Sequence, residues 1–236
     1  MEHAVMSRAK ASKPAAPDPK AILVIDVGGN NVKVALGHHD QPVKVPSGRD
    51  MTAQQMIDDV LQATRDWKYE AVSIGFPGSV KAGRPAREPA NLADGWVTTD
   101  FAAAFGRPVR IVNDAALQAL GAHEGGRMLF LGLGTGLGST LVSDLEFDPL
   151  ELGHLPYRKG GSFEDYVGER GLLRLGKKKW TRHVFRVVEL LRDALQADYV
   201  VLGGGQTKKL KSVPPGVRLG AGNAAIVGGV RLWTRP

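Results

Sequence analysis

Two widely separated segments of the chain share one pattern, in which an apolar strand runs into a glycine-rich turn and a second strand follows. The first covers residues 21–36, with its turn at Gly28 and Gly29, and the second covers residues 128–144, with glycines from Gly132 to Gly138. β-Branched residues favour strands, and glycines let the backbone turn sharply or lie close to a ligand. The long interval between the copies indicates two related lobes rather than a short-period repeat array.

The rest of the chain alternates between helical and strand patterns. Thr52 and Gln55 form a capping-box pattern ahead of apolar residues at helical spacing, which predicts a helix over about residues 52–66. Strands are expected in residues 70–80 and 107–114, with a helix directly after the second of them. A further helix is expected in residues 183–196, followed by a buried strand that ends in three glycines. Mixed strands and helices of this kind predict the α/β class.

Composition limits the compartment and the chemistry. No stretch approaches the roughly 20 apolar residues that cross a bilayer, and the start has no apolar run typical of a signal peptide. We therefore expect a cytoplasmic protein with no membrane partner. Residues 1–19 are rich in Ala, Pro and Lys and are predicted to be a disordered lead. The chain has no cysteine, which excludes disulfides, thiolate zinc sites and a cysteine nucleophile.

The positive charge of the chain is unevenly distributed and includes two main lysine clusters. The net charge is +7, and the clusters are Lys177–Lys179 and the group Lys208, Lys209 and Lys211. A basic balance favours an anionic partner without identifying it. The clusters would suit a long polyanion, whose binding weakens as salt rises, but a solvated surface face is the alternative for either one.

The second glycine turn differs from the known nucleotide-binding loops. Its spacing is G-x-G-x-G-x-G, a strand-like segment follows where a dinucleotide fold needs a helix, and the chain contains no Walker motif. The bare N–H groups of the turn, with the hydroxyls of Thr135 and Ser139, form a candidate phosphate-binding site. A tight structural hairpin is the alternative.

Carboxylates stand at the ends of two predicted strands. Asp26 ends the first strand, and Asn113 and Asp114 follow another strand and precede a helix. Ligands of α/β proteins bind at the carboxyl ends of strands, although Asn113 taken alone is more typical of a helix N-cap. One such carboxylate can take a proton from an alcohol while the other helps to hold a magnesium phosphate.

A short polar segment holds Glu151, His154 and Glu164. The E-x-x-H spacing would place metal ligands on one helical turn, but Gly153 and Pro156 argue against an α-helix there. Two carboxylates and an imidazole also suit the hydroxyl groups of a sugar. A structural histidine is the alternative.

In their order, these motifs resemble the sugar-kinase members of the repressor, ORF and kinase (ROK) family, within the actin-like ATPase and hexokinase superfamily. Asp26 to Lys33 resembles the family's first phosphate motif, and Gly132 to Gly138 resembles its second. Val112 to Ala115 resembles the segment of the catalytic aspartate, and Glu151 to His154 resembles the E-x-G-H sugar signature. The resemblance covers about residues 21–236.

This resemblance implies a two-lobed α/β fold of the actin-like ATPase (ribonuclease H-like) type, with a ligand cleft between the lobes. The N-terminal lobe is expected at residues 20–113 and the C-terminal lobe at residues 114–236, with the last helix packing back on the N-terminal lobe. A homodimer is expected at the level of the family, and nucleic acid is not expected as a partner.

The resemblance also implies a role for each matching residue. Asp114 would be the catalytic base, and Asp26 would hold Mg²⁺, directly or through water. The implied sugar-binding residues are Asn91, Asn113, Glu151, His154 and Glu164. The implied residues for the phosphoryl donor are Asp26, Gly28, Gly29, Asn30, Lys33, Gly134, Thr135, Gly136 and Gly204. No zinc is expected, because the zinc loop of many family members needs the cysteines that this chain lacks.

Among the subfamilies, the polyphosphate glucokinases are the most similar, through HLPYRKG, RLGKKKW and the terminal GGVRLW. This similarity implies transfer of a phosphoryl group from inorganic polyphosphate, or ATP, to the 6-hydroxyl of glucose. One alternative is an ATP-dependent hexose or N-acyl-hexosamine kinase of the same family. Another is a sugar-binding sensor with impaired catalysis, because Asn30 stands where the family usually has Thr or Ser. A DNA-binding repressor is disfavoured, because the segment before residue 21 is too short and polar for a helix-turn-helix.

Overall fold

A computed structural model describes residues 16–37, 41–144 and 146–234 and contains two five-stranded sheets of the same topology. The first sheet has the order β3-β2-β1-β4-β7, in which β1 runs antiparallel to β2 and parallel to β4. Its strands are β1 (Ile22–Val27), β2 (Asn31–Leu36), β3 (Val43–Pro46), β4 (Ala71–Phe76) and β7 (Val109–Asn113). Every residue of β1 and β4 is buried, as expected for central strands of a covered sheet.

The second sheet repeats this arrangement in the order β10-β9-β8-β13-β14. Here β8 runs antiparallel to β9 and parallel to β13. Its strands are β8 (Arg127–Leu133), β9 (Leu137–Ser143), β10 (Glu146–Leu150), β13 (Tyr199–Gly203) and β14 (Val217–Leu219). Two short ribbons complete the strands, namely β5 (Val80–Lys81) with β6 (Arg84–Pro85) and β11 (Pro156–Arg158) with β12 (Gly161–Ser162). Both glycine hairpins that the sequence predicts are thereby confirmed.

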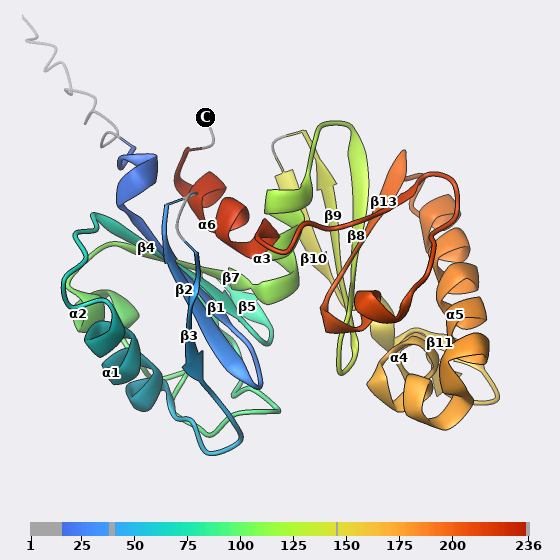
Figure 1. The fold of residues 1–236 in the computed structure, drawn as a ribbon, viewed down its shortest axis with the longest axis horizontal. Coiled ribbons are helices and arrows are strands. Elements are labelled where there is room, and N and C mark those ends of the chain that lie inside the picture. Colours follow the sequence, from blue (N-terminus) through green and yellow to red (C-terminus); the bar gives the residue numbers. More distant parts are fainter. Residues whose placement is uncertain (1–15, 38–40, 145, 235–236) are drawn as a thin grey trace, which may run out of the picture.

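The helices lie in three layers that alternate with the two sheets (Figure 1). An outer layer of α1 (Ala53–Ala63) and α2 (Phe101–Phe105) covers the first sheet, and an outer layer of α4 (Phe163–Val167) and α5 (Glu169–Ala194) covers the second. Between the sheets lie α3 (Asp114–Ala122) and α6 (Ala224–Thr234). Single 3-10 turns occur at Pro19–Ala21, Leu152–His154 and Gly205–Lys209. We call the first sheet with α1 and α2 the first lobe, and the second sheet with α4 and α5 the second lobe.

Helix α3 contacts both sheets and so joins the two lobes. Leu117 and Leu120 pack with β1 and α6, whereas Ala115 and Ala119 pack with β8 and β9 of the second sheet. Helix α6 lies against β1 and β4 and is held there by the Ser73 hydroxyl, which donates a hydrogen bond to the carbonyl oxygen of Gly229 at 2.6 Å. The exact boundary between the lobes, predicted after residue 113, stays a prediction.

Local patterns predicted the helices unevenly. Helix α1 has the predicted capping box at Thr52 and Gln55 and ends at Ala63, a few residues before the predicted end. Two helical segments make up α5, because Gly176 between them has non-helical backbone angles. The segment that contains residue 183 begins after Gly176, before the predicted start, because residues 177–182 hold only one apolar residue, Trp180.

The first described residues already belong to the fold. The side chain of Asp18 accepts a hydrogen bond from the backbone of Lys20, and the Asp18 backbone donates to Glu70. Residues 1–15 of the predicted lead lie outside the described residues. Within the part of the chain that the structure describes, no helix is long and apolar enough to cross a membrane.

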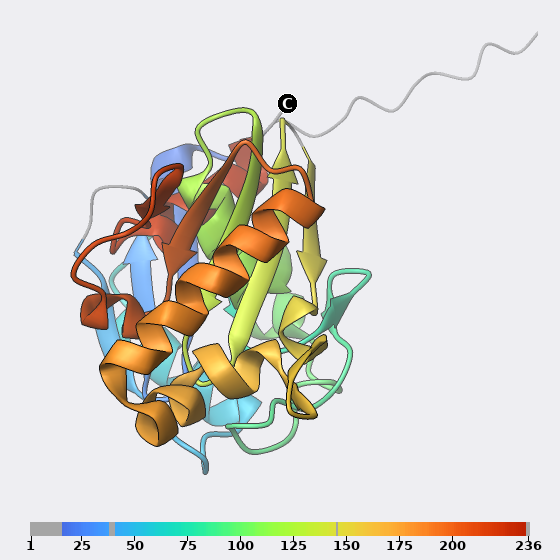
Figure 2. The same ribbon diagram turned by 90° about the vertical axis from the view of Figure 1, so that its right-hand side faces the viewer.

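Figure 2 shows the second lobe from its outer side, with α5 crossing diagonally in front of the strands of the second sheet. The indole of Trp180 on α5 is fully buried and donates to the carbonyl oxygen of Val167 on α4 at 2.7 Å. This contact ties the two helices together and fixes α4, which follows the polar segment of Glu151 and His154.

Candidate functional site

The first glycine turn is fixed by neighbours on both sides. Asp26, at the end of β1, is buried, and its Oδ2 lies 3.1 Å from the Nζ of Lys33 on the paired strand. The Ser47 hydroxyl donates to the carbonyl oxygen of Gly28 at 2.6 Å, and the Ser47 N–H donates to the carbonyl oxygen of Asn30 at 3.1 Å. These hydrogen bonds tie the turn to the residue that follows β3. Sequence reasoning missed Ser47, because its role depends on the pairing of β2 with β3.

Asn113 and Asp114 lie where β7 ends and α3 begins. The Oδ1 of Asn113 accepts hydrogen bonds from the N–H groups of Ala115 and Ala116, at 2.9 and 3.3 Å, and its amide donates to Gly78 at 3.0 Å. Asn113 is therefore the N-cap of α3, as the structural interpretation of this residue predicted. Its cap places Asp114 as the first residue of the helix, at the carboxyl end of the parallel strands.

The surroundings of Asp114 oppose its negative charge. Burial raises the pKa of its carboxyl from 3.8 to about 7, with further increases from the nearby charges of Asp26 and Glu151, while a hydrogen bond from the Ala115 N–H acts in the opposite direction. Asp26 comes from the first sheet, and Glu151 comes from the segment that follows the second sheet. A carboxyl with a pKa near neutrality is suited to accept a proton and release it again.

The second glycine turn lies against Glu164. A Cβ on Gly136 would lie 2.5 Å from Oε2 of Glu164, and a Cβ on Gly153 would lie 3.4 Å from the same oxygen. The carboxylate of Glu164 therefore lies directly beside both glycines, and at Gly153 a Cβ would also lie 2.8 Å from the carbonyl oxygen of Leu137. Glu164 is in the first turn of α4, and a capping box between Ser162 and Asp165 closes the N-terminus of this helix. The turn itself is braced by the Glu169 N–H, which donates to the carbonyl oxygens of Gly134 and Thr135.

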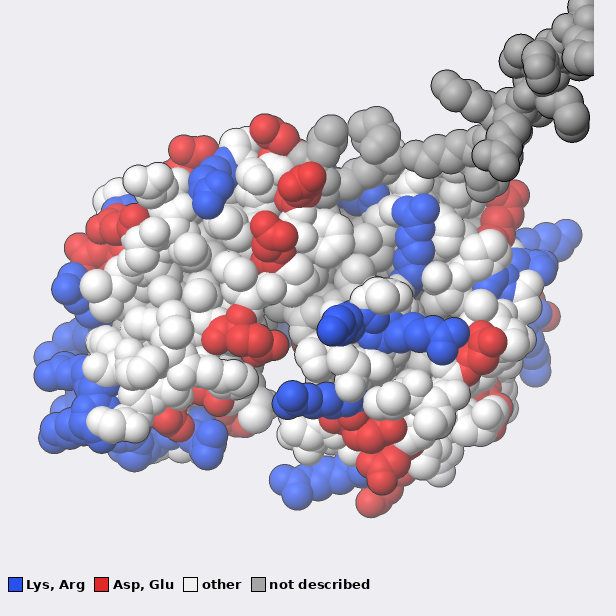
Figure 3. Space-filling model, turned by 180° about the vertical axis from the view of Figure 1, so that it is seen from behind, with Lys and Arg blue, Asp and Glu red and all other residues white. Residues whose placement is uncertain are grey.

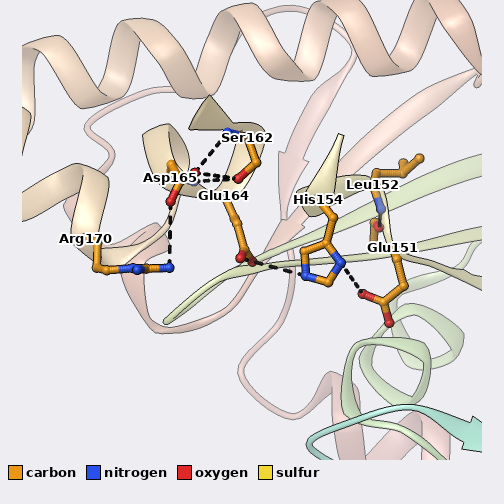
Figure 4. A network of polar contacts seen from close by, with 8 residues as sticks. Glu151, Leu152, His154, Ser162, Glu164, Asp165 and Arg170 are labelled. Carbon is orange, nitrogen blue, oxygen red and sulfur yellow. Dashed lines mark hydrogen bonds and ion pairs between the residues drawn. The ribbon is translucent and has the colours of Figure 1, made fainter. Parts of the chain in front are cut away.

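His154 lies between two carboxylates (Figure 4). Its Nδ1 is 3.8 Å from Oε2 of Glu151, and its Nε2 is 3.8 Å from Oε1 of Glu164. Glu151 and His154 are mostly exposed, at 70% and 67% of their side chains, whereas Glu164 is exposed by 25%. The three predicted residues thus form one polar cluster whose acceptors and ring nitrogens are open to a ligand.

Ser139 has a structural role that differs from its predicted one. Its hydroxyl is buried, donates to the carbonyl oxygen of Leu150 at 2.7 Å and accepts from the N–H of Leu152 at 3.2 Å. The expectation that this hydroxyl faces a phosphate was wrong, because it is used to attach the turn of Leu152–His154 to β9. Ser139 therefore positions the segment that carries Glu151 and His154.

The remaining predicted residues lie around the two turns. A Cβ on Gly29 would be 3.9 Å from the Cβ of Asn91, so this asparagine lies beside the first turn. Gly204 follows β13 with a φ of 84°, and a Cβ there would overlap the carbonyl oxygen of Leu133. Gly203 pairs with Gly132 between β13 and β8, which places Gly204 beside the second turn.

The two halves of the site face one another across the molecule. Both glycine turns lie at the lower end of their sheets in Figure 1, and the space-filling view shows a notch between the two lobes at that end (Figure 3). Among the described residues, no group of three or more His, Asp or Glu side chains is placed to hold a metal ion. Asp26 is a candidate for a single carboxylate ligand, because its Oδ1 is not part of the ion pair with Lys33.

The sequence was compared with family models, and the model described as the ROK family matches residues 22–156, more than half of the chain. The chain belongs to the ROK family. This match includes the first glycine turn, Asp114, the second glycine turn and His154. The predicted family is therefore confirmed.

The chain is similar to proteins named polyphosphate glucokinase from mycobacteria. The protein of Mycobacterium tuberculosis (strain ATCC 25618 / H37Rv) is 26% identical over 211 residues, which cover 78% of this chain and 77% of that protein. The protein of Mycobacterium leprae (strain TN) is 25% identical over 207 residues. This chain spans 63% of the length of the M. leprae relative.

Solved structures of the family have the same fold. An inorganic polyphosphate/ATP-glucomannokinase from Arthrobacter sp. strain KM matches with a TM-score of 0.76 and 24% identity, covering 92% of this chain and 97% of that one. A ROK family glucokinase from Streptomyces griseus, in complex with glucose and AMPPNP, matches with a TM-score of 0.68 and 18% identity, covering 89% and 99%. The predicted two-lobed α/β fold of the actin-like ATPase type is confirmed.

Proposed function

We propose that this protein is a sugar kinase that transfers the terminal phosphoryl group of inorganic polyphosphate, or ATP, to the 6-hydroxyl of glucose. The observation that carries the proposal is Asp114. It combines a raised pKa with a position at the carboxyl ends of the strands, between a polar cluster suited to a sugar and two glycine turns suited to phosphate. The mycobacterial polyphosphate glucokinases, to which the chain is about a quarter identical over 78% of its length, support it.

In the proposed reaction, the ionised carboxylate of Asp114 accepts the proton of the sugar 6-hydroxyl. The freed oxygen attacks the terminal phosphorus, a new O–P bond forms, and the bond to the rest of the donor breaks with its electron pair on the departing phosphate oxygen. Phosphoryl transfer leaves little covalent work to the protein, so placement and electrostatics dominate. A base with a pKa of about 7 gains and releases its proton readily near neutral pH.

The sugar would be held by the polar cluster together with two asparagines. Glu151, His154 and Glu164 offer acceptors and ring nitrogens within one open cluster. Asn91 lies beside the first turn, and Asn113 keeps part of its amide for a ligand while it caps α3. Hydroxyl groups of a sugar match such a mixture of donors and acceptors.

The donor would lie against the two glycine turns, where side chains are absent and backbone N–H groups can approach phosphate oxygens. The proposed donor-binding residues are Asp26, Gly28, Gly29, Asn30, Lys33, Gly134, Thr135, Gly136 and Gly204. Lys33 is 43% exposed while it pairs with Asp26, so its ammonium group also faces solvent. A positive group in this position suits a polyphosphate and a nucleotide equally.

Asp26 would hold Mg²⁺ directly or through water. A single carboxylate fits this ion, because Mg²⁺ in kinases is bound through one or two carboxylates, several waters and the phosphates of the substrate. When bound, the ion supplies positive charge that stabilises the transferred phosphoryl group. The buried position of Asp26 fixes where such an ion would be held.

The test is the formation of glucose 6-phosphate by the purified protein with Mg²⁺ and either polyphosphate or ATP. We expect product with polyphosphate, and Asp114→Ala should reduce turnover by at least about 100-fold, because removal of a general base has effects of that size. Near-normal turnover in the variant would overturn the role of Asp114. A preference for ATP would instead assign the chain to the ATP-dependent hexose kinases.

A catalytically impaired sugar sensor is the second candidate, and Asn30 favours it. The amide side chain of Asn30 stands where the family usually has the hydroxyl of a Thr or Ser. The backbone carbonyl of Asn30 accepts a hydrogen bond from the Ser47 N–H. The sensor predicts saturable glucose binding, measured by calorimetry, without any sugar phosphate from either donor. Homodimer formation and a cytoplasmic location stay predictions.

A further inference from the structure

A second basic site lies on the outer side of the second lobe, away from the glycine turns. A pocket of about 310 Å³ opens between β11 and α5, and its lining residues are Tyr157, Arg158, Lys179, Arg182, His183 and Arg186. None of the residues proposed to bind the sugar or the donor lines it. In the space-filling view, Lys and Arg side chains gather densely along the lower outer edge of this lobe (Figure 3).

Most of the positive charge in this pocket has no carboxylate partner. Arg186 pairs with Glu189, with 2.6 Å between Nη1 and Oε2. Within the described ranges of the chain, none of the ion pairs includes Arg158, Lys179 or Arg182. Three neighbouring cations without counter-charges repel one another, and an anion in the pocket would remove that repulsion.

The aromatic rings at the back of the pocket are packed against each other. Tyr157 meets Tyr166 edge to face at 5.2 Å, and Tyr166 meets the ring of His183 at 4.9 Å. The guanidinium of Arg174 lies over Tyr166 at 4.9 Å. Nucleic-acid binding sites use open ring faces for stacking, whereas the rings of Tyr157, Tyr166 and His183 contact one another here. The pocket therefore suits phosphate groups without bases.

The spacing of the cations suits a chain of phosphates better than a single one. Lys179, Arg182 and Arg186 are three and four residues apart, so they lie on one face of α5. At about 1.5 Å per helical residue, the row extends over roughly 10 Å. Orthophosphate would contact one or two of these groups, whereas linked phosphates can contact all of them.

The pocket shares structural elements with the candidate site. Tyr157 is on β11, which starts two residues after His154, and Tyr166 is on α4, the helix that carries Glu164. The Tyr157 hydroxyl lies 3.2 Å from Nδ1 of His183 and so connects β11 with α5. A ligand in the pocket therefore contacts β11, the strand that follows the turn of Leu152–His154.

We propose that this pocket is an anchoring site for inorganic polyphosphate, which holds a distant segment of the polymer while its end occupies the transfer site. The proposed role of the pocket rests on the proposed kinase function. Binding of polyphosphate to the pocket can nevertheless be measured without any phosphoryl transfer. A polymer that is bound in the pocket stays near the transfer site between successive transfers. Its free end then binds the transfer site as part of a molecule that is already held, which raises its effective concentration there.

The binding test compares matched double variants. We would measure long-chain polyphosphate binding by calorimetry without sugar, in wild type, in Lys179→Gln/Arg182→Gln, and in Lys20→Gln/Lys68→Gln, which removes the same charge from exposed sites of the first lobe, away from its glycine turn. The pocket variant should bind about tenfold more weakly, a change of about 1.4 kcal/mol, with a shallower dependence on salt. The control should bind like wild type.

The kinetic test separates the anchor from the transfer site. In Lys179→Gln/Arg182→Gln, the KM for long polyphosphate should rise about tenfold while the KM for ATP changes by less than about twofold, because ATP is too short to reach both sites. Equal binding of polyphosphate by both double variants would overturn the proposal. So would displacement of polyphosphate from the pocket by ATP or single-stranded DNA at equal phosphate concentration.

The two proposals fail in different ways. If wild type binds polyphosphate, the pocket variant does not, and no donor yields a sugar phosphate, then the anchoring site stands and the kinase function fails. If sugar phosphate forms from polyphosphate while the pocket variant retains full binding, the kinase stands and the anchor fails.

Protonation of His183 gives an independent readout. Burial, and then the charges of Arg158, Arg182 and Arg174, lower the pKa of its imidazole. A bound polyanion would raise that pKa again, so binding should take up a proton and weaken as pH rises from about 6 to 8. Calorimetry in two buffers of different ionisation enthalpy measures the uptake, and His183→Gln should abolish it. Unchanged uptake in that variant would contradict this part of the proposal. The titratable and charged groups around the ring are Tyr157, Arg158, Asp165, Tyr166, Arg174, Lys179, Arg182 and Arg186.

Discussion

The surroundings of Asp114 disfavour the negative charge of its carboxylate. The same surroundings suit the carboxylate to accept a proton. The unfolded chain ionises this carboxyl with an ordinary pKa, whereas burial in the folded protein raises the pKa to about 7. Between the two pKa values the folded state binds more protons, so the stability due to this group is present at low pH and is lost as pH rises towards 7. Removal of the charge should therefore stabilise the protein above neutrality.

We predict that Asp114→Asn raises the free energy of unfolding by about 2 to 4 kcal/mol at about pH 8, and by much less as the pH approaches about 4. Urea unfolding at several pH values measures this. Asp148→Asn is a matched control on an exposed carboxylate of β10 and should leave stability within about 0.5 kcal/mol. A gain that does not depend on pH would contradict the raised pKa.

Ser47 fixes the first glycine turn through two hydrogen bonds, and its hydroxyl provides one of them. Ser47→Ala should raise the KM for the phosphoryl donor about fivefold, because one hydrogen bond contributes about 1 kcal/mol to holding the turn in place. The KM for glucose should stay unchanged. Ser143→Ala, at the end of β9 opposite to the glycine turn, is the control. Equal donor KM values for the two variants would show that Ser47 does not position the turn.

Individual residues differ in how far sequence patterns can identify them. Asp26 and Asp114 are recognisable because each follows a buried strand, where ligands of α/β proteins bind. Ser47 and Ser139 are not recognisable, because what their hydroxyls contact depends on strand pairings and turns that local patterns leave open. A hydroxyl beside a glycine turn can face a ligand or a carbonyl, and only the three-dimensional arrangement decides between them.

At the scale of elements, the contact between α3 and α6 depends on glycine. A Cβ on Gly228 would overlap the carbonyl oxygen of Leu117, and a Cβ on Gly121 would overlap that of Ala224. The two helices therefore approach at the distance that bare glycines allow. This contact also supports α3, which carries Asp114 at its first position.

We predict that Gly228→Ala lowers the free energy of unfolding by about 1 to 3 kcal/mol, as overpacking of a core does. Gly222→Ala is the matched control, because a Cβ there meets nothing within 4 Å. It should change stability by less than about 0.5 kcal/mol. Denaturant unfolding of the two variants measures this difference. Equal midpoints would show that α3 and α6 can move apart without a loss of stability.

Elements with complete local signals are the ones that sequence predicted best. The capping box and apolar face of α1 lie within one short segment and determine where that helix starts. The part of α5 that follows Gly176 begins with three lysines, and the buried Trp180 holds it against α4. The start of this segment was therefore not accessible to local reasoning.

At the scale of the whole molecule, the pKa of Asp114 results from parts that are distant in the chain. Asp26 belongs to the first lobe, Glu151 to the second, and α3 lies between the sheets (Figure 1). The resemblance to the ROK family implied that these residues share one site, and the two glycine hairpins proved to belong to sheets of one topology. The extent of the pKa change depends on burial at that junction, which spacing arguments do not reach.

The pH dependence of phosphoryl transfer tests this account most directly. We would measure kcat/KM for glucose with the preferred donor between about pH 5.5 and 8.5. The account predicts a rate that increases about tenfold per pH unit below neutrality and levels off above a pKa of about 7, because Asp114 must be ionised to accept the proton. A rate that is constant over this range would mean that Asp114 ionises like an ordinary carboxyl, and it would contradict the central claim.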